Sequence, residues 1–390
     1  MSDAAGRLCR HFGVCGGCAF QDKPYGEQLA AKEQIVRHVV EPFRPERFLP
    51  IRPSPQAYFY RNKMEFAFGG VLGGPALLGL REKGRFNRIV SLEECLLLSP
   101  EVPALLESVR RWADEEKVPT YHLRAHKGFL RYLAVREGKN TGERMVHLVT
   151  APGELPRDSF LAALKRSGVP VTSAVWSVNE ALSDVAYGKV SAVLSGSGSI
   201  TEELLGRRFR ISPTAFFQTN TRGAEILYKI VAEALGGGAE TLFDFYCGSG
   251  AIGLCCADAG RRVIGVEVHA PAVEDARLNA REQGADRAEF HAADAAAFVR
   301  LPEWMSLWGS PSTAAVFDPP RTGLSAPVRE LLVTRPLERW IYVSCNPEAL
   351  ARDLPALAGT YRLESVQPVD LFPHTEHVET VLLFHRRPPA

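Results

Sequence analysis

The fold of this chain is decided by the stretch Phe243-Asp244-Phe245-Tyr246-Cys247-Gly248-Ser249-Gly250-Ala251-Ile252-Gly253. Its apolar first half predicts a buried strand, the glycines predict a tight turn, and the residues after them predict the start of a helix. Glycine is needed in such a turn because the backbone passes close beneath a ligand and adopts positive φ angles. The stretch therefore predicts a ligand-binding turn of an α/β sheet.

The sequence after residue 211 continues this alternation of strands and helices. Strands are expected over 262–268, 287–290, 313–317 and 340–344, with a helix over 271–283. Two last strands, over 362–371 and 378–385, have no helix between them, so they predict an antiparallel hairpin on a mostly parallel sheet. We expect one domain over 211–390 and a second over 1–210, with a helix over about 24–41 as a candidate to pack on the C-terminal domain.

Residues around the glycine turn indicate a nucleotide-containing cofactor. Gly248, Gly250 and the glycine three positions later match a dinucleotide fingerprint, so an NAD-dependent oxidoreductase is one interpretation. Glu267 closes the next strand, where its carboxylate can accept both ribose hydroxyls. Asp294 follows the third strand, in position for an adenine edge, and the turn Asp318-Pro319-Pro320-Arg321 follows the fourth. A dehydrogenase needs neither of these last two features, whereas S-adenosylmethionine suits both and is therefore favoured.

A cysteine stands where a nucleotide-modifying enzyme would need a nucleophile. Cys345 ends an apolar strand that Asn346-Pro347 stops, and open α/β sheets bind their ligands at such carboxyl ends. Addition of a thiolate to C6 of uracil makes C5 able to attack a methyl donor. The hydrogen left on C5 must then be removed, and Glu379 in the last strand is a candidate base. Alone, the cysteine would be a small buried apolar residue and Glu379 a surface residue of an edge strand.

The turn at Asp318 indicates which base is modified. Amino-directed methyltransferases usually carry an aromatic residue after the two prolines, where this chain has Arg321. Enzymes that methylate C5 of cytosine in RNA usually carry a cysteine in this turn, and here there is none. Both absences favour uracil, and the Asp318 carboxylate can accept from uracil N3–H, which cytosine lacks.

The first part of the chain is mildly basic and rich in short strands. Of the 46 Lys and Arg residues, 23 lie in the first 150 positions, against 17 of the 45 acidic residues. Aromatic and basic side chains alternate around residues 58–68 and 130–136, as in sheets that bind single-stranded RNA, and make Arg61, Lys63, Arg131 and Arg136 candidate RNA contacts. Half-buried strands with ordinary polar faces are an equal alternative. We find neither an apolar run of membrane-spanning length nor a leader before Cys9, so we expect a cytoplasmic protein.

Four of the eight cysteines form a metal-binding pattern. Cys9, Cys15 and Cys18 lie close together, with two glycines that allow a tight fold, and Cys95 follows later. A chain without a leader is expected to keep thiols or metal ligands rather than disulfides. Spacing alone does not separate structural zinc from an iron–sulfur cluster, since both accept four thiolates.

These residues together resemble the RNA uracil-C5 methyltransferase family over nearly the whole chain. Ser212-Pro213-Thr214-Ala215-Phe216-Phe217-Gln218-Thr219-Asn220 is similar to the family's signature at the entry of the catalytic domain. Three further segments match the family's catalytic motifs. They are Asp318-Pro319-Pro320-Arg321, Ser344-Cys345-Asn346-Pro347 and His374-Thr375-Glu376-His377-Val378-Glu379.

The resemblance implies a class I S-adenosylmethionine-dependent methyltransferase fold, with a Rossmann-like seven-stranded sheet and a β-rich RNA-binding domain. It implies that Cys345 is the nucleophile and that Glu379, rather than Glu376, accepts the proton. The implied cofactor-binding residues are Gln218, Tyr246, Gly248, Gly250, Glu267, Asp294 and Asp318, whereas Ala251 stands where many members have Asn. It also implies a four-iron, four-sulfur cluster on Cys9, Cys15, Cys18 and Cys95.

Two departures select a branch of this family. There is no β-barrel RNA-binding domain before the cysteines, unlike the longer branch acting on 23S ribosomal RNA, and the cysteines themselves are absent from the typical bacterial transfer-RNA branch. With Gly250-Ala251-Ile252-Gly253-Leu254-Cys255-Cys256-Ala257 after the loop, the chain most resembles the branch that methylates uridine 747 of 23S ribosomal RNA.

We therefore expect a 23S ribosomal RNA uracil-C5 methyltransferase that flips a hairpin or loop uridine into its site, with no membrane and no obligate protein partner. A transfer-RNA uridine methyltransferase and a non-catalytic, RNA-binding iron–sulfur protein remain alternatives.

Overall fold

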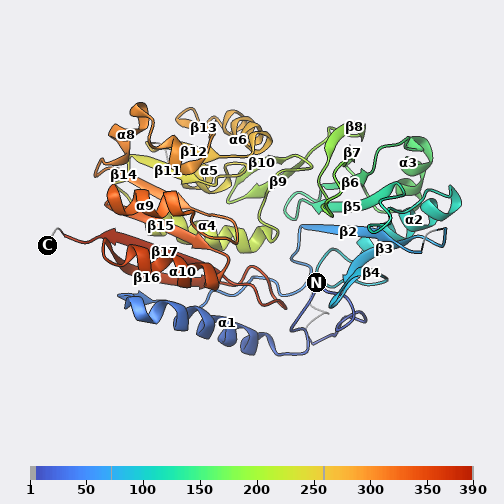
Figure 1. Cartoon of the computed structure of the whole chain (residues 1–390), viewed down its shortest axis with the longest axis horizontal. Coiled ribbons are helices and arrows are strands. Elements are labelled where there is room, and N and C mark those ends of the chain that lie inside the picture. The colour runs from blue at the N-terminus through green and yellow to red at the C-terminus, as the bar shows by residue number, and fades with distance from the viewer. Residues whose placement is uncertain (1–5, 72, 258–259, 389–390) are drawn as a thin grey trace. The chain divides into compact units, whose positions relative to one another are not determined.

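The computed structural model describes residues 6–71, 73–257 and 260–388, and the chain divides into two compact units (Figure 1). The α/β unit consists of Tyr25–Pro55, Leu204–Arg210 and the residues from Ala215 onward. The β-rich unit consists of the segment up to Pro24, Gln56–Glu203 and Ile211–Thr214. The sequence suggested a change of domain at residue 210, with a helix over about 24–41 as a candidate to pack on the C-terminal domain. In the structure the chain enters the α/β unit at Tyr25, leaves it after Pro55 and returns.

The α/β unit contains one large sheet and its covering helices. Its elements are α1 (Tyr25–Val40), η1 (Glu41–Phe43), β1 (Arg47–Phe48), α4 (Thr221–Leu235), β11 (Thr241–Phe245), α5 (Ala251–Cys256), β12 (Arg262–Glu267), α6 (Ala270–Glu282), β13 (Ala288–Ala292), α7 (Ala295–Phe298), α8 (Pro302–Trp308), β14 (Thr313–Phe317), α9 (Ala326–Thr334), β15 (Arg339–Ser344), α10 (Pro347–Leu357), β16 (Tyr361–Val369) and β17 (Glu379–Arg386).

The sheet of this unit has eight strands, in the order β1-β16-β17-β15-β14-β11-β12-β13, rather than the seven expected. The additional strand is β1, which pairs in parallel with β16 and places Arg47 opposite Ser365. β17 runs antiparallel to both of its neighbours, β15 and β16, as the predicted hairpin requires. The remaining strands are parallel, so the sheet is mixed, as the sequence predicted.

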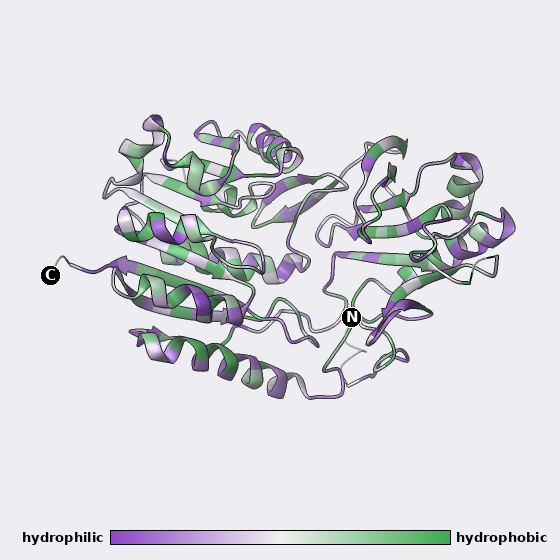
Figure 2. Ribbon diagram, viewed as in Figure 1, coloured by the Kyte–Doolittle hydropathy of each residue, from purple (hydrophilic) through white to green (hydrophobic). Residues whose placement is uncertain are grey.

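Helices cover both faces of this sheet. Phe243 and Phe245 of β11 face a core to which α1 and α7–α10 contribute. The alternate residue Asp244 faces α5, where its Oδ2 accepts from the backbone nitrogen of Gly253 at 2.8 Å. In Figure 2 the strands are mostly coloured as hydrophobic, while α1 alternates along its length as an amphipathic helix does.

The β-rich unit contains a seven-stranded sheet in the order β4-β3-β2-β5-β6-β7-β8. Trp112 and Phe160, with ring centroids 5.0 Å apart, join its two helices over the core. Its elements are β2 (Lys63–Gly69), β3 (Leu77–Glu82), β4 (Arg85–Ser91), α2 (Val102–Glu115), β5 (Leu130–Glu137), β6 (Arg144–Thr150), α3 (Arg157–Arg166), β7 (Ser173–Val178) and β8 (Lys189–Ser195). The short strands β9 (Ile200–Leu204) and β10 (Arg207–Ile211) pair with one another. In the part of the chain that the structure describes, we find no helix both long and apolar enough to cross a membrane.

Candidate active site

The order of the strands places a binding site at the carboxyl ends of β11 and β14. After β11 the chain passes outward to β12 and β13, then returns to β14 on the other side of β11. Ligands of open α/β sheets bind at such a reversal of strand order. Phe245 pairs with Phe317 in the last rung, so Tyr246 and Asp318 leave the sheet side by side.

The turn after β11 has a backbone that only some residues can adopt. Gly248 and Gly250 have φ angles of 53° and 80°, and Tyr246, which is not a glycine, has a φ of 62°. A Cβ on Gly250 would lie 2.8 Å from the Phe290 ring, so side chains are excluded there by space as well as by conformation. Positive φ at Tyr246 costs about 1–3 kcal/mol, which is typical of a functional turn.

Two acidic side chains stand at the ends of the next two strands. The Glu267 carboxylate accepts from the backbone nitrogens of Gly248, at 3.2 Å, and His269, at 2.8 Å, so it is held beside the glycine turn. Asp294 caps α7, accepting from the Ala297 nitrogen at 2.9 Å. The cap gives Asp294 a structural role in addition to the cofactor contact predicted for it.

A small pocket of about 20 Å³ lies against the same turn. It brings together the predicted residues Gln218, Tyr246 and Asp318, whereas Gly248, Gly250, Glu267 and Asp294 are not in its wall. The pocket is lined by Phe216, Phe217, Gln218, Tyr228, Tyr246, Cys247, Ser249, Ala251, Ile252 and Asp318. The aromatic residues of this pocket, together with the Glu267 carboxylate held beside the glycine turn, provide groups that can contact a nucleoside cofactor.

Cys345 and Glu379 are brought together by the register of β15 and β17. Ser344 lies opposite Thr380 in this antiparallel pair, so one further rung sets Cys345 opposite Glu379. Residues directly opposite one another have Cβ atoms roughly 4.5–5.5 Å apart. Asn346 joins the neighbouring motif, because its Nδ2 donates to the Arg321 carbonyl at 2.9 Å.

The charges of this group influence one another. Burial and the nearby Asp318 raise the pKa of Glu379, and burial raises the pKa of Asp318 against the lowering effect of a hydrogen bond with Gln218. Burial, Glu379 and Asp318 raise the pKa of the Cys345 thiol to about 12. Two carboxyls so close share a proton more readily than both ionise, and the cysteine rests as a thiol.

Glu379 differs sharply from its neighbour Glu376. Its side chain is buried, while Glu376 is exposed. Among the described residues, the Oε2 atom of Glu379 has no hydrogen-bond partner. A buried carboxylate oxygen without a partner is costly unless a ligand supplies one.

Helix α1 supports the segment that leads into β17. The Lys32 ammonium donates to Asp370 Oδ1 at 2.7 Å and to the Phe372 carbonyl at 2.9 Å, and this ion pair is fully buried. One turn earlier, the Gln28 side-chain oxygen accepts from the His374 backbone nitrogen at 2.8 Å. These contacts position the loop that carries His377 and Glu379.

The four cysteines predicted to bind a metal gather in the β-rich unit. Burial and the neighbouring thiols of Cys95, Cys15 and Cys9 raise the pKa of Cys18 to about 12. Gln21 spans their loop, accepting from the Cys9 nitrogen at 2.9 Å and donating to Cys18 Sγ at 3.4 Å. Yet residues 6–71, 73–257 and 260–388 hold no group of three or more His, Cys, Asp or Glu side chains that could bind a metal ion. The iron–sulfur centre is therefore not shown, since the thiols gather without a ligating arrangement.

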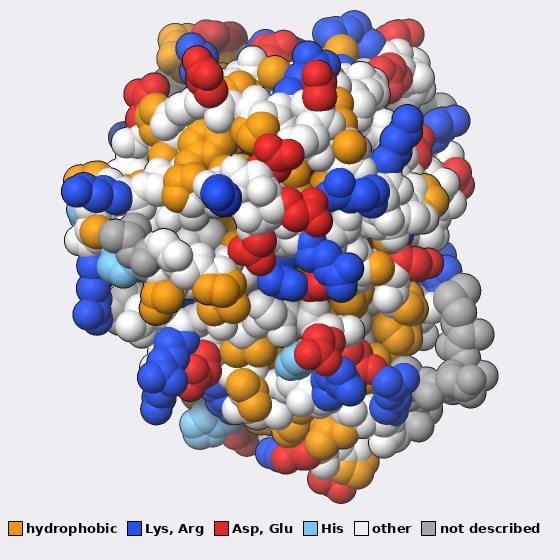
Figure 3. Space-filling model, turned by 90° about the vertical axis from the view of Figure 1, so that its right-hand side faces the viewer, with side chains coloured by type: hydrophobic (Ala, Val, Ile, Leu, Met, Phe, Trp, Pro, Cys, Tyr) orange, Lys and Arg blue, Asp and Glu red, His pale blue; other side chains and the backbone are white. Residues whose placement is uncertain are grey.

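Two of the predicted RNA contacts are not on the surface. Arg131 and Arg136 are each only 3% exposed. Arg131 donates to the carbonyls of Asn179 at 3.1 Å and Ala181 at 2.6 Å, which identifies it as a structural residue. Lys63 is paired with Glu65 at 2.7 Å. The face shown in Figure 3 carries Lys and Arg interspersed with Asp and Glu rather than one basic patch.

Three residues of the site were not among the site residues predicted from the sequence. Phe216 is 58% exposed although it is a large apolar residue, and its carbonyl accepts from Ser249 Oγ at 3.3 Å. Its place in the signature around Gln218 was the available signal. Tyr228 lies on the apolar face of α4 and Asp244 inside a buried strand, where burial raises the pKa of each; neither position had a sequence signal.

The fold and the site together define a class I, S-adenosylmethionine-dependent methyltransferase. The family model for tRNA (Uracil-5-)-methyltransferase matches residues 201–387. Uncharacterized RNA methyltransferases of Clostridium tetani and Caldanaerobacter subterraneus are 37% and 38% identical, each over 97% of this chain and 84% of their own length. The crystal structure of Pyrococcus abyssi tRNA (uracil-54, C5)-methyltransferase in complex with S-adenosyl-L-homocysteine has a TM-score of 0.80 and 33% identity, covering 95% of this chain and 84% of that one. The chain belongs to the RNA uracil-C5 methyltransferase family.

Proposed function

We propose that this protein methylates C5 of a uridine in 23S ribosomal RNA, of the uridine 747 type, through a covalent bond between Cys345 and C6 of the base. One observation carries the proposed mechanism: a thiol, a buried carboxyl group with an unpartnered oxygen and a second carboxyl meet at the ends of β15, β17 and β14. The ribosomal target is supported by the resemblance of residues 250–257 and of the cysteine pattern to that branch, and such an enzyme would act in the cytoplasm.

The side chains divide the reaction between them. Asp318 accepts from N3–H of the uracil, and the Cys345 thiol gives its proton to solvent as its sulfur bonds to C6, so that the electrons of the C5–C6 double bond make C5 nucleophilic. Bound S-adenosylmethionine supplies the methyl group that C5 takes. Glu379 Oε2 then removes the hydrogen from C5, and the electrons of that bond restore the double bond and expel the sulfur.

The raised pKa of Glu379 suits this last step. A general base works best when its pKa lies near the working pH, and an ordinary glutamate is too weak a base for that. The cofactor would be held by the predicted residues Gln218, Tyr246, Gly248, Gly250, Glu267 and Asp294, of which Glu267 is already fixed beside the glycine turn.

The proposal includes a four-iron, four-sulfur cluster on Cys9, Cys15, Cys18 and Cys95, in a unit that binds the RNA. It is supported by four sulfur donors gathered in one unit and by the family resemblance. The cluster would have a structural role, joining the N-terminal segment to the loop of Cys95.

Transfer RNA is the second candidate substrate. It is favoured by the solved relative from Pyrococcus abyssi, which acts on uracil 54 of transfer RNA and is similar to nearly the whole chain.

The test uses purified protein, S-adenosylmethionine and 5-fluorouridine transcripts of a 23S hairpin and of a transfer RNA. Fluorine on C5 cannot leave as a proton, so the enzyme should stop as a covalent complex visible on a denaturing gel. We expect a cofactor-dependent band with the 23S hairpin that Cys345→Ala abolishes. A band with the transfer RNA alone would show that transfer RNA, rather than 23S ribosomal RNA, is the substrate. The absence of a band with either RNA would contradict the mechanism.

A further inference from the structure

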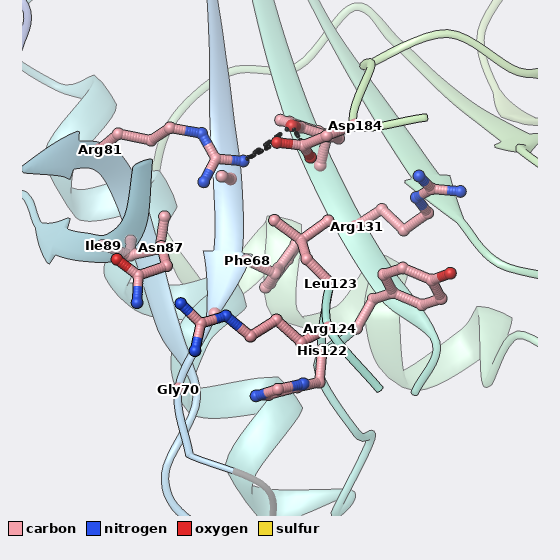
Figure 4. A pocket seen from close by; sticks show the side chains of 14 residues that line it. Phe68, Gly70, Arg81, Asn87, Ile89, His122, Leu123, Arg124, Arg131 and Asp184 are labelled. Atoms are coloured by element: carbon pink, nitrogen blue, oxygen red, sulfur yellow. Dashed lines mark hydrogen bonds and ion pairs between the residues drawn. The ribbon is translucent and has the colours of Figure 1, made fainter. Parts of the chain in front are cut away.

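The β-rich unit contains a pocket that the methylation chemistry does not use. Its volume is about 190 Å³, which is smaller than the roughly 300–1,000 Å³ typical of sites for larger ligands. Figure 4 shows side chains from several segments around it. The lining residues are Ala67, Phe68, Gly69, Gly70, Arg81, Asn87, Ile89, Tyr121, His122, Leu123, Arg124, Arg131, Tyr132 and Asp184.

Local irregularity in strand β5 builds one wall of this pocket. Leu130 pairs with Thr150 and Tyr132 with Val149, so Arg131 is an extra residue in the ladder, a β-bulge. Bulges re-aim side chains and are frequent beside functional sites. Here the bulge lets two consecutive residues, Arg131 and Tyr132, both line the pocket.

Arg131 fixes the aromatic side of the pocket. Its guanidinium lies 4.5 Å from the centre of the Tyr121 ring. The same group donates to the carbonyls of Asn179 and Ala181, in the segment that leads to Asp184. The buried arginine therefore holds both Tyr121 and the Asp184 segment in place before any ligand arrives.

Hydrogen-bonding groups stand at the opposite wall. Arg81 Nη2 forms an ion pair with Asp184 and also donates to the Tyr132 hydroxyl at 3.1 Å (Figure 4). The Tyr132 hydroxyl in turn donates to Asp184. Burial and Asp184 raise the pKa of Tyr132 to about 12, so the hydroxyl remains a donor. A guanidinium beside a carboxylate offers both a donor and an acceptor, which any nucleobase edge can meet.

Arg124 supplies a positive charge at the mouth of the pocket. Its side chain is exposed and extends toward the side formed by Asn87 and Gly70 (Figure 4). Within the described part of the chain, its guanidinium has no ion pair or hydrogen bond. Such an arginine is suited to a phosphate, to which it can donate two parallel hydrogen bonds.

We propose that this pocket binds a second unpaired nucleotide of the RNA substrate, with the base beside Tyr121 and its phosphate on Arg124. This inference rests on the proposed function for the identity of the ligand as RNA. The combination of an aromatic side chain, a donor–acceptor pair and one uncommitted cation is that of sites for unstacked RNA bases. The uridine to be methylated would enter the Cys345 site, so this is a different nucleotide of the same loop.

The experiment measures binding of fluorescein-labelled 23S hairpin RNA to the full chain by anisotropy, with each loop nucleotide in turn made abasic. We expect one loop position besides the target uridine where loss of the base weakens binding to the wild type by about five- to a hundredfold. In Tyr121→Leu and Arg124→Ala, binding to the intact RNA should fall, and in Tyr121→Leu the abasic change at that position should have no further effect. Arg111→Ala, on α2 outside the pocket, should bind as the wild type does.

The 5-fluorouridine complex is measured on the same variants, and it separates the two proposals. If the complex forms and the pocket variants keep the wild-type abasic pattern, the pocket inference is wrong and the proposed function stands. If no complex forms but binding depends on Tyr121 and Arg124, the RNA site stands without the chemistry. The inference would be overturned if the protein bound a free mononucleotide as tightly as the hairpin. It would also be overturned if RNA binding did not depend on the pocket residues and no covalent complex formed.

Discussion

At the scale of single residues, Glu379 is the side chain whose environment is most informative. It begins β17, is 2% exposed, and keeps one oxygen without a partner among the described residues. Its chemically identical neighbour Glu376 is exposed. The pair offers a matched comparison, because only the buried carboxylate can act on a base held at Cys345.

Replacing Glu379 with glutamine should stop the reaction after methyl transfer. The C5 proton then has no acceptor, so the methylated RNA should remain bonded to Cys345 even when ordinary uridine is used. We expect turnover to fall by about 10²–10⁴-fold and a band to persist on a denaturing gel. Glu376→Gln should turn over normally, and normal turnover of Glu379→Gln would disprove the assigned role.

The same carboxyl makes stability depend on pH in a defined direction. Its pKa in the folded protein is raised, so the folded state holds the proton over a range where the unfolded state has lost it, and stability falls as pH rises from the unfolded pKa to the folded one. Glu379→Gln, which has no charge to lose, should gain in melting temperature relative to the wild type between pH 5 and pH 8. A shift of only one pKa unit corresponds to about 1.4 kcal/mol, or roughly 2–4 °C. Melting curves across pH, with Glu376→Gln as the control, measure this; a constant difference would contradict it.

At the scale of elements, α1 acts as a support for the loop before β17. Its buried ion pair, Lys32 with Asp370, is the most enclosed contact between the helix and that loop. Burial lowers the pKa of Lys32 while Asp370 raises it, so the charge of each residue depends on the other.

Lys32→Met should destabilise the protein by about 3–5 kcal/mol, because it leaves a buried, unpaired Asp370. Adding Asp370→Asn removes that charge and should restore much of the loss while keeping a group near the Phe372 nitrogen, from which Asp370 accepts at 3.0 Å. Urea unfolding measures both. Arg37→Met, which breaks the half-exposed pair with Glu33 on the same helix, should cost less than about 1 kcal/mol.

Elements with a local signal could be predicted from the sequence, and elements formed by distant pairing could not. The strand over 313–317 has the expected bounds in the structure, because an apolar run between turns specifies it. β1 contains two residues and exists only because Arg47 meets Ser365. Arg131 was wrongly predicted to contact RNA for a related reason. The alternation of side chains along the strand predicted an exposed position, whereas the β-bulge in β5 places Arg131 in a buried one.

In the site, too, the residues that follow a motif could be predicted from the sequence, and the residues placed only by packing could not. Cys345, Asp318 and Glu379 follow strands whose ends are brought to one edge by topology, so motif and topology together locate them. Tyr228 and Asp244 lie in ordinary apolar patterns, and only packing reveals them. The arrangement of the four cysteines depends on a fold around Gln21 that spacing does not determine.

At the scale of the molecule, the two units allow the effects of the cysteines to be separated from those of the cofactor site. Cys18→Ser should lower soluble yield and RNA affinity together, since it would disrupt the cluster proposed for the β-rich unit. Binding of S-adenosylmethionine, followed by calorimetry on the remaining soluble protein, should be unchanged. Iron content and visible absorbance of anaerobically purified protein should fall in Cys18→Ser but not in Cys255→Ser. If the wild-type protein is colourless and contains zinc, the four cysteines bind zinc rather than an iron–sulfur cluster.

The interrupted course of the chain has a consequence during synthesis. Lys32 and Asp370 are 338 positions apart, so α1 leaves the ribosome long before the residue that neutralises its buried charge. At the roughly 5–20 residues per second of protein synthesis, that interval is on the order of 17–70 s. The β-rich unit, encoded between them, is complete early enough to fold during this delay. A nascent chain stalled before residue 370 should therefore present a folded β-rich unit beside an unassembled helix, which pulse proteolysis of stalled ribosomes would detect.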